Sequence, residues 1–193
     1  MTEGVFTLDV SAVDSGFAND EARQLIECWR RSNGLLNDSL LPLSRRLIML
    51  NGNYNQHDAP EILFAGNDAL ASRILGDGWA RHPETGTMDT DYRCLISEAY
   101  RVAILQRRPV FDLVSTTLHA QGRSIHLRYH RVIVPLETMQ GAPFLGCYSF
   151  PAGTDLPVAP GKPDGVCLPR QQQRKRGQAG PFVAADFPSH ARA

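Results

Sequence analysis

The sequence predicts an α+β fold, in which helices cover one face of a five-stranded antiparallel sheet. Three consecutive strands are indicated between Arg107 and Phe150, because the turns Gln121-Gly122 and Gln140-Gly141 divide an otherwise strand-forming stretch. Two further strand candidates and three segments with helical periodicity precede this meander. A meander cannot cover its own apolar face, so we expect the upstream segments to cover it.

Length and composition suit one globular domain with extensions: 193 residues, 42% of them hydrophobic and 21% charged. Twenty basic and twenty acidic residues cancel, so no overall field attracts nucleic acid or a membrane. The N-terminus lacks the basic and apolar regions of a signal peptide, and no window approaches the roughly 18 apolar residues of a membrane span. We therefore expect a cytoplasmic protein.

The first regular element is expected to be a helix. Residues 1–16 show no clear period and are predicted to form an N-terminal arm. A helix is predicted over residues 19–32, because Asn19 can cap its start and Gly34 follows its end. An apolar stripe at helical spacing runs along it: Ala22, Leu25, Ile26 and Trp29. Two interpretations of this stripe stay open, packing on the chain's own sheet or the interface of a homodimer.

Short elements connect this helix to the longest one. Residues 35–43 are expected to form a loop that buries several leucines, and Arg45–Leu50 and Glu61–Ala65 are the two additional strand candidates. A short helical face follows: Leu70, Ala71, Ile74 and Leu75. The clearest helix of the chain is predicted from Asp89 to Gln106, and Pro109 stops it.

The turn at Gln121-Gly122 determines which side chains of the meander share a face. A two-residue turn places Ala120 opposite Arg123, and strand alternation assigns the other residues. One mainly apolar face then combines residues from both strands: Val110, Asp112, Val114, Thr116, Leu118, Ile125, Leu127, Tyr129, Arg131 and Ile133. His126, Arg128 and His130 point the other way, to a mixed face, as expected for a sheet covered on one side.

The composition changes after Phe150. Residues 152–193 are dense in Pro and Gly and contain six Lys or Arg against three Asp. Such a segment cannot bury enough apolar surface to offset its chain entropy, so we predict a disordered basic tail. The folded domain is therefore placed at residues 17–151.

The order of the predicted elements resembles that of a PAS domain. The segments that carry the resemblance are Trp29 in the leading helix, Ile62–Gly66, Arg108–Val110 and Tyr129–Leu136, which look like a PAS-like family common in alphaproteobacteria. The resemblance covers about residues 17–150. It implies a five-stranded antiparallel sheet with helices on one face and a sensory or protein-interaction role in a stand-alone domain. It implies no fixed ligand.

The residue patterns of common cofactor and metal sites are missing, so we expect neither. The long helix has no His to ligate a haem, and Cys94 does not lie in the segment that flavin-binding PAS domains carry. His119 and His126 could be diagonal neighbours, but no further ligand joins them, and we interpret these two and His130 as surface histidines of strands. No hydrolase, nucleotide-binding or kinase motif is present, so we do not expect an enzyme.

Arg131 is the most informative candidate site residue. An arginine on the apolar face of a central strand must find an anion, because a buried unpaired charge is very costly. One interpretation is a structural pair with Asp112, although we expect the strand register to leave that carboxylate some distance away. The other is a pocket under the long helix for an anionic ligand, with hydroxyls from Tyr129, Tyr92 and Tyr100.

Three functions follow from these observations. The first is a signalling adaptor that dimerises through the leading helix and docks on another regulatory protein. The second is a small-molecule sensor with a pocket between the long helix and the sheet. The third is weak binding of nucleic acid or another polyanion through Arg170–Arg176 of the tail. The adaptor is the leading hypothesis.

Overall fold

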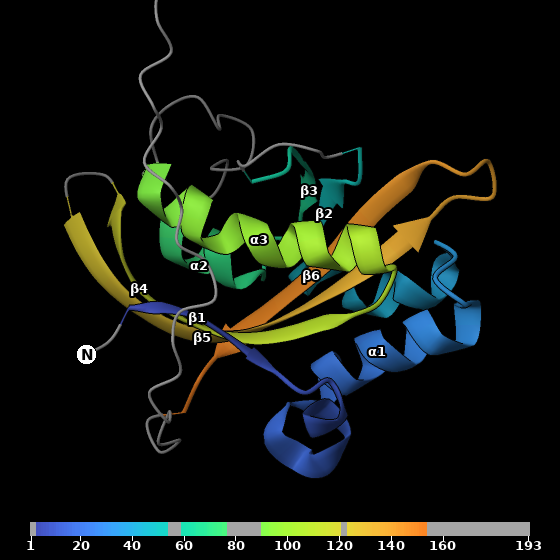
Figure 1. Ribbon diagram of the computed structural model, residues 1–193, viewed down its shortest axis with the longest axis horizontal. Helices are drawn as coiled ribbons and strands as arrows, with labels where there is room; N and C mark the ends of the chain where they lie inside the picture. The colour runs from blue at the N-terminus through green and yellow to red at the C-terminus, as the bar shows by residue number, and fades with distance from the viewer. Residues whose placement is uncertain (1–2, 54–58, 77–89, 121–122, 154–193) are drawn as a thin grey trace, which may run out of the picture.

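The computed structural model describes residues 3–53, 59–76, 90–120 and 123–153, which form a six-stranded antiparallel sheet with helices on both faces (Figure 1). The strand order is β1-β4-β5-β6-β2-β3. The strands are β1 (Gly4–Leu8), β2 (Leu47–Asn51), β3 (Ile62–Ala65), β4 (Val110–Ala120), β5 (Arg123–Glu137) and β6 (Pro143–Pro151). The helical elements are η1 (Val13–Phe17), α1 (Asp20–Ser32), η2 (Asp38–Arg46), α2 (Leu70–Leu75) and α3 (Thr90–Gln106). The α+β class is confirmed.

The sheet has six strands rather than the predicted five, because the segment expected to be an arm contributes β1. Val5 of β1 lies opposite Val114 of β4, and Leu8 lies opposite Phe111. The added strand pairs the edge of β4 that would otherwise present unpaired backbone groups. The prediction of an arm is wrong for these residues, since a five-residue strand is too short to show a clear alternation.

The register of the meander agrees with the prediction from its turn. Ala120 lies opposite Arg123, and Val110 lies opposite Ile133 at the far end of the β4–β5 ladder. The turn residues 121–122 themselves lie outside the described part of the chain. At the second turn, Gly141 adopts a φ of +83°, a left-handed conformation that glycine accepts without strain.

The predicted helices form close to their expected bounds. The side chain of Asn19 accepts a hydrogen bond from the Ala22 amide at 3.1 Å and caps α1. Asn33 ends α1 in the left-handed conformation. The expected loop at residues 35–43 is instead largely the 3₁₀ helix η2, which buries Leu40 and Leu43 and delays β2 to Leu47.

Two hydrophobic cores lie on opposite faces of the sheet. On one face α2 and α3 cover residues such as Val114, Leu118 and Ile133. On the other, η1, α1 and η2 cover residues such as Phe111 and Val132. Figure 1 shows α3 and α1 on opposite sides of the strands. The prediction of helices on one face is therefore wrong, because both faces of the meander carry large apolar side chains that need a cover.

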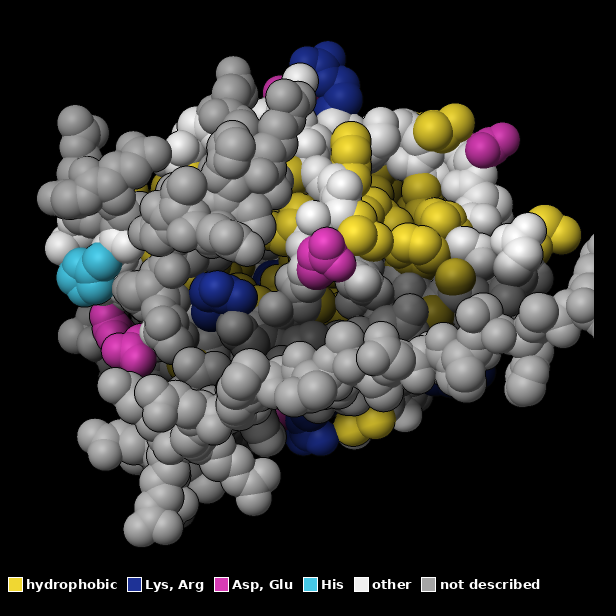
Figure 2. Space-filling view, turned by 90° about the horizontal axis from the view of Figure 1, so that it is seen from above, with side chains coloured by type: hydrophobic (Ala, Val, Ile, Leu, Met, Phe, Trp, Pro, Cys, Tyr) yellow, Lys and Arg dark blue, Asp and Glu magenta, His cyan; other side chains and the backbone are white. Residues whose placement is uncertain are grey.

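Some apolar surface remains exposed. Leu63 and Phe64 of the edge strand β3 are about half exposed, at 47% and 46%. Figure 2, a space-filling view from above, shows hydrophobic side chains gathered on one part of the face that it presents. In the described residues no helix is long and apolar enough to cross a membrane. The predicted tail lies outside the described residues from position 154 onward.

Candidate functional site

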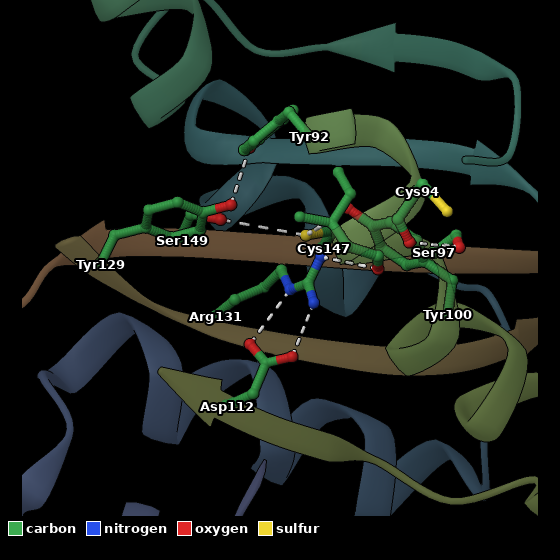
Figure 3. A network of polar contacts seen from close by, with 10 residues as sticks. Tyr92, Cys94, Ser97, Tyr100, Asp112, Tyr129, Arg131, Cys147 and Ser149 are labelled. Atoms are coloured by element: carbon green, nitrogen blue, oxygen red, sulfur yellow. Dashed lines mark hydrogen bonds and ion pairs between the residues drawn. The ribbon is translucent and has the colours of Figure 1, made fainter. Parts of the chain in front are cut away.

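The centre of the site is an ion pair between neighbouring strands. Asp112 of β4 lies directly opposite Arg131 of β5. The Nε of Arg131 donates to Oδ1 of Asp112 at 3.1 Å, and its Nη2 donates to Oδ2 at 2.6 Å (Figure 3). Both side chains are almost completely buried, at 1% and 0% exposure. This bidentate geometry neutralises both charges within the sheet.

Helix α3 closes over the guanidinium group of Arg131. The Nη1 of Arg131 donates to the backbone carbonyl of Ile96 at 3.3 Å. The ring of Tyr100 lies over the guanidinium, with 4.7 Å between the ring centroid and Cζ, in a cation–π arrangement. Burial lowers the pKa of Arg131, but the carboxylate of Asp112 opposes this effect and the net shift is well upward. The arginine is therefore permanently charged and held between strand and helix.

Two tyrosines connect the same helix to β5. The hydroxyls of Tyr92 in α3 and Tyr129 in β5 lie 2.8 Å apart and form a hydrogen bond. Burial raises the pKa of Tyr92 and raises that of Tyr129 well above its usual range. Both phenols are therefore neutral at physiological pH and can donate hydrogen bonds.

Strand β6 supplies two further polar groups. Cys147 lies opposite Ile133 and Ser149 lies opposite Arg131 in the β5–β6 ladder, so both face α3. The Sγ of Cys147 is 3.9 Å from the hydroxyl of Tyr100 and 4.0 Å from the Oγ of Ser149, long distances even for contacts to sulfur. Burial raises the pKa of the Cys147 thiol and raises that of Tyr100 well above its usual range. These groups are neutral and only weakly hydrogen-bonded to one another.

These groups line a cavity of about 80 Å³ between the sheet and helices α2 and α3. Its polar wall is formed by Tyr92, Tyr100, Tyr129, Arg131, Cys147 and Ser149. Its apolar wall is formed by Ile48, Leu50, Ala59, Pro60, Ile62, Leu70, Ala71, Ile74, Leu75, Ile96, Leu118 and Leu127. A mainly apolar cavity with a few converging polar groups is the usual form of a small-molecule site.

The structure brings the four predicted ligand-binding residues together, since Tyr92, Tyr100, Tyr129 and Arg131 all line this cavity. The expectation that the register separates Asp112 from Arg131 is wrong, because pairing Ala120 with Arg123 also places Asp112 opposite Arg131. Sequence reasoning missed the two residues of β6. The same alternation, continued across the Gln140-Gly141 turn, would have placed Cys147 and Ser149 on this face.

The predicted dimer stripe faces the chain's own sheet. Ala22, Leu25 and Ile26 are completely buried in the core beneath α1. Trp29 packs against the same core, and its Nε1 donates to the carbonyl of Pro135 in β5 at 2.8 Å. Of the two interpretations left open, the structure therefore shows packing on the sheet. Ala22, Leu25 and Ile26 do not form a free surface for a second copy, since the sheet buries them, and Trp29 is partly buried against the same core.

His130 occupies the core under α1 rather than the surface. Its side chain is 3% exposed and stacks between Phe111 and Phe150, with ring centroids 5.4 and 5.2 Å apart. Its Nδ1 has no hydrogen-bond partner within the described residues. Burial and, to a smaller extent, Arg128 lower its pKa. The interpretation as a surface histidine is wrong for His130, since the face it points to is covered.

Comparisons of this chain with protein-family models, with curated proteins and with solved structures found no match.

Proposed function

We propose that this chain is a PAS-like sensory domain that binds a small molecule in the cavity between α3 and the sheet. The observation that carries the proposal is the cavity itself, in which buried polar groups from α3, β5 and β6 meet inside an apolar wall. Buried polar groups that converge on a cavity orient a ligand, while the apolar wall supplies most of its binding energy.

The arrangement of elements supports the PAS-like part of the proposal. From α1 to β6 the chain runs helix, two strands, short helix, long helix and three-strand meander, with the 3₁₀ helix η2 added before β2. The resemblance in the sequence implies this order. The additional strand β1 joins the outer edge of β4, so the other five strands form a continuous sheet in the order β4-β5-β6-β2-β3.

The position of the cavity suits a sensor. A ligand there would contact helix α2, helix α3 and strands β2, β3, β4, β5 and β6 at once. A molecule that binds between these elements stabilises the observed arrangement of α2 and α3 on the sheet relative to any arrangement that it binds less tightly. The role is binding rather than catalysis, because burial keeps the Cys147 thiol and the tyrosine hydroxyls protonated and poorly suited as nucleophile or base.

The adaptor hypothesis requires an interaction surface other than the apolar stripe of α1, on which it was based. The stripe on α1 is buried, whereas Leu63 and Phe64 of β3 expose about half of their surface at the edge of the sheet. Hydrophobic side chains also gather on the face shown in Figure 2. Docking on another signalling protein, and formation of a homodimer, stay as second proposals. The polyanion proposal concerns Arg170–Arg176, outside the described residues.

A cavity-filling substitution tests the sensor. Ala71 of α2 lines the cavity, so Ala71→Leu should reduce its volume, while Ala142→Leu at an exposed position serves as the matched control. We expect small molecules from a screening panel to raise the melting temperature of the full-length protein and of Ala142→Leu by several degrees. Ala71→Leu should lose these shifts. No shift for any compound, together with native mass spectra that show no bound species, would contradict the sensor.

A further inference from the structure

The charges around the cavity restrict what it can bind. Both oxygens of Asp112 are engaged by Arg131, and the guanidinium is further held by the Ile96 carbonyl and the ring of Tyr100. An anionic ligand would have to displace a buried carboxylate that already occupies the best geometry for Arg131. A cationic ligand would find no unoccupied carboxylate among the lining residues. Either charge would remain uncompensated in a mostly apolar cavity, which is very costly.

Two hydroxyl groups at the cavity, those of Tyr100 and Ser149, lack a good hydrogen-bond acceptor. The Tyr100 hydroxyl interacts with the guanidinium of Arg131, which can only donate, so among the described residues its one hydrogen-bond acceptor is the Cys147 thiol at 3.9 Å. The only side-chain partner of the Ser149 hydroxyl in that part of the chain is the same thiol at 4.0 Å. Tyr100 is 7% exposed, so water outside the protein scarcely reaches it. A buried hydroxyl without a good acceptor costs free energy, and an acceptor atom placed in the cavity would recover it. The polar residues of the cavity therefore present hydrogen-bond donors that lack a good acceptor within the protein.

The volume limits the size of the ligand. An apolar protein cavity of about 150 Å³ holds benzene, which has six non-hydrogen atoms. By proportion, a cavity of about 80 Å³ suits a molecule of about three or four non-hydrogen atoms. Leu50, Leu118 and Leu127 also line the cavity, so most of the surface of this molecule must be apolar.

From these three restrictions we infer that the cavity binds a small uncharged molecule with a compact apolar body and one acceptor oxygen, such as a carbonyl. The oxygen accepts hydrogen bonds from Tyr100 and Ser149, and the apolar body contacts the leucines. The inference rests on the proposed function and replaces the anionic ligand expected from the sequence. It assigns to Tyr100 the role of principal donor to the ligand.

Three probes of the same shape test the inference on the full-length protein: acetone, acetate and 2-methylpropene. Each has four non-hydrogen atoms in a planar, branched arrangement, and they differ in carrying a neutral acceptor, a negative charge or no polar atom. Binding is followed as saturable shifts of protein NMR signals at constant ionic strength. We expect acetone to bind at least tenfold more tightly than acetate and about fivefold more tightly than 2-methylpropene, which corresponds to one ordinary hydrogen bond.

Tyr100→Phe separates the hydrogen bond from the shape of the cavity. It should weaken acetone binding about fivefold and leave 2-methylpropene binding unchanged, which also shows that the variant is folded. Tyr148→Phe is the matched control, because its hydroxyl bonds Asn19 in the core on the other face of the sheet. It should leave the affinity for all three probes unchanged.

The possible results separate failure of this inference from failure of the proposed function. Tighter binding of acetate than of acetone would overturn the uncharged ligand and leave the sensor intact. Equal binding of acetone and 2-methylpropene, with no effect of Tyr100→Phe, would overturn the acceptor and the role of Tyr100 while the cavity still binds. If none of the three probes binds, both the inference and the sensor fail.

Discussion

Asp112 and Arg131 lie directly opposite each other in the β4–β5 ladder and join their charges through two hydrogen bonds of 3.1 and 2.6 Å. Because the pair is buried, removal of one partner leaves an uncompensated charge in the core. Asp112→Leu and Arg131→Met should each lower the free energy of unfolding by about 3–5 kcal/mol. The double variant should be more stable than either single variant, as measured by urea denaturation.

The ion pair between Asp14 and Arg30 is the matched control for this prediction. It is also bidentate, with distances of 2.8 and 3.1 Å, but about half of each side chain is exposed. Arg30→Met should therefore cost less than about 1 kcal/mol. If Arg131→Met cost no more than Arg30→Met, the pair in the sheet would not be isolated from water.

The apolar stripe of α1 should contribute to the stability of a single chain. Leu25→Asp places a charge in the core beneath α1, so it should reduce the free energy of unfolding by several kcal/mol or prevent folding. Gln24→Asp, at the exposed neighbouring position, should change it by less than about 1 kcal/mol. Urea midpoints measured at several protein concentrations give the test. A folded, stable Leu25→Asp protein of altered solution mass would instead support the dimer interface.

Acid should destabilise the fold through His130. Its pKa is lowered in the folded state, mainly by burial, so the unfolded chain takes up the proton first, near pH 6.5. Stability is therefore complete above about pH 6.5 and is lost as the pH falls toward the lower pKa of the folded state. His130→Phe should reduce this slope, and His119→Gln, at an exposed site, should not. Identical pH profiles for wild type and His130→Phe would contradict the assignment.

Alkali should act through the three tyrosines at the cavity. Burial raises the pKa values of Tyr92, Tyr100 and Tyr129 in the folded state, so the unfolded chain loses these protons first, near about pH 10. Stability is therefore complete below about pH 10 and falls as the pH rises above it. The part of the tyrosinate ultraviolet absorbance that is lost in a variant with Tyr92, Tyr100 and Tyr129 replaced by Phe should appear together with unfolding. Ionisation of these three tyrosines in a still-folded protein near pH 10 would show that water reaches the cavity.

Local patterns were sufficient to predict most elements of the fold. Asn19 and the apolar stripe define α1, and the Gly-containing turns define the ladders from Val110 to Pro151. The face of the sheet that α1 covers was not predictable. An apolar stripe shows that a helix packs against other apolar residues, but it does not show on which face of the sheet the helix lies. Strand β1 was missed because its pairing with β4 joins residues more than one hundred positions apart, and no local signal specifies such a contact.

The alternation of side chains along the first two strands of the meander predicts part of the site. Tyr129 and Arg131 were placed correctly because the turn determines their face, and Tyr92 and Tyr100 because they lie on the helix above it. The prediction lacks Cys147 and Ser149, because they lie on the third strand, beyond the second turn of the meander. The neutral character of the site follows from the pairing of Asp112 with Arg131, which the predicted register separates and the structure places directly opposite each other.

The sensor requires that the cavity between α3 and the sheet be accessible to a small molecule. The most direct test is a crystal structure of the full-length protein equilibrated with xenon, which enters apolar protein cavities. We predict one xenon atom in contact with Leu118 and Leu127 in the wild type, and none there in Ala71→Leu. A wild-type crystal with xenon bound elsewhere but none beneath α3 would show that the cavity is closed to small molecules.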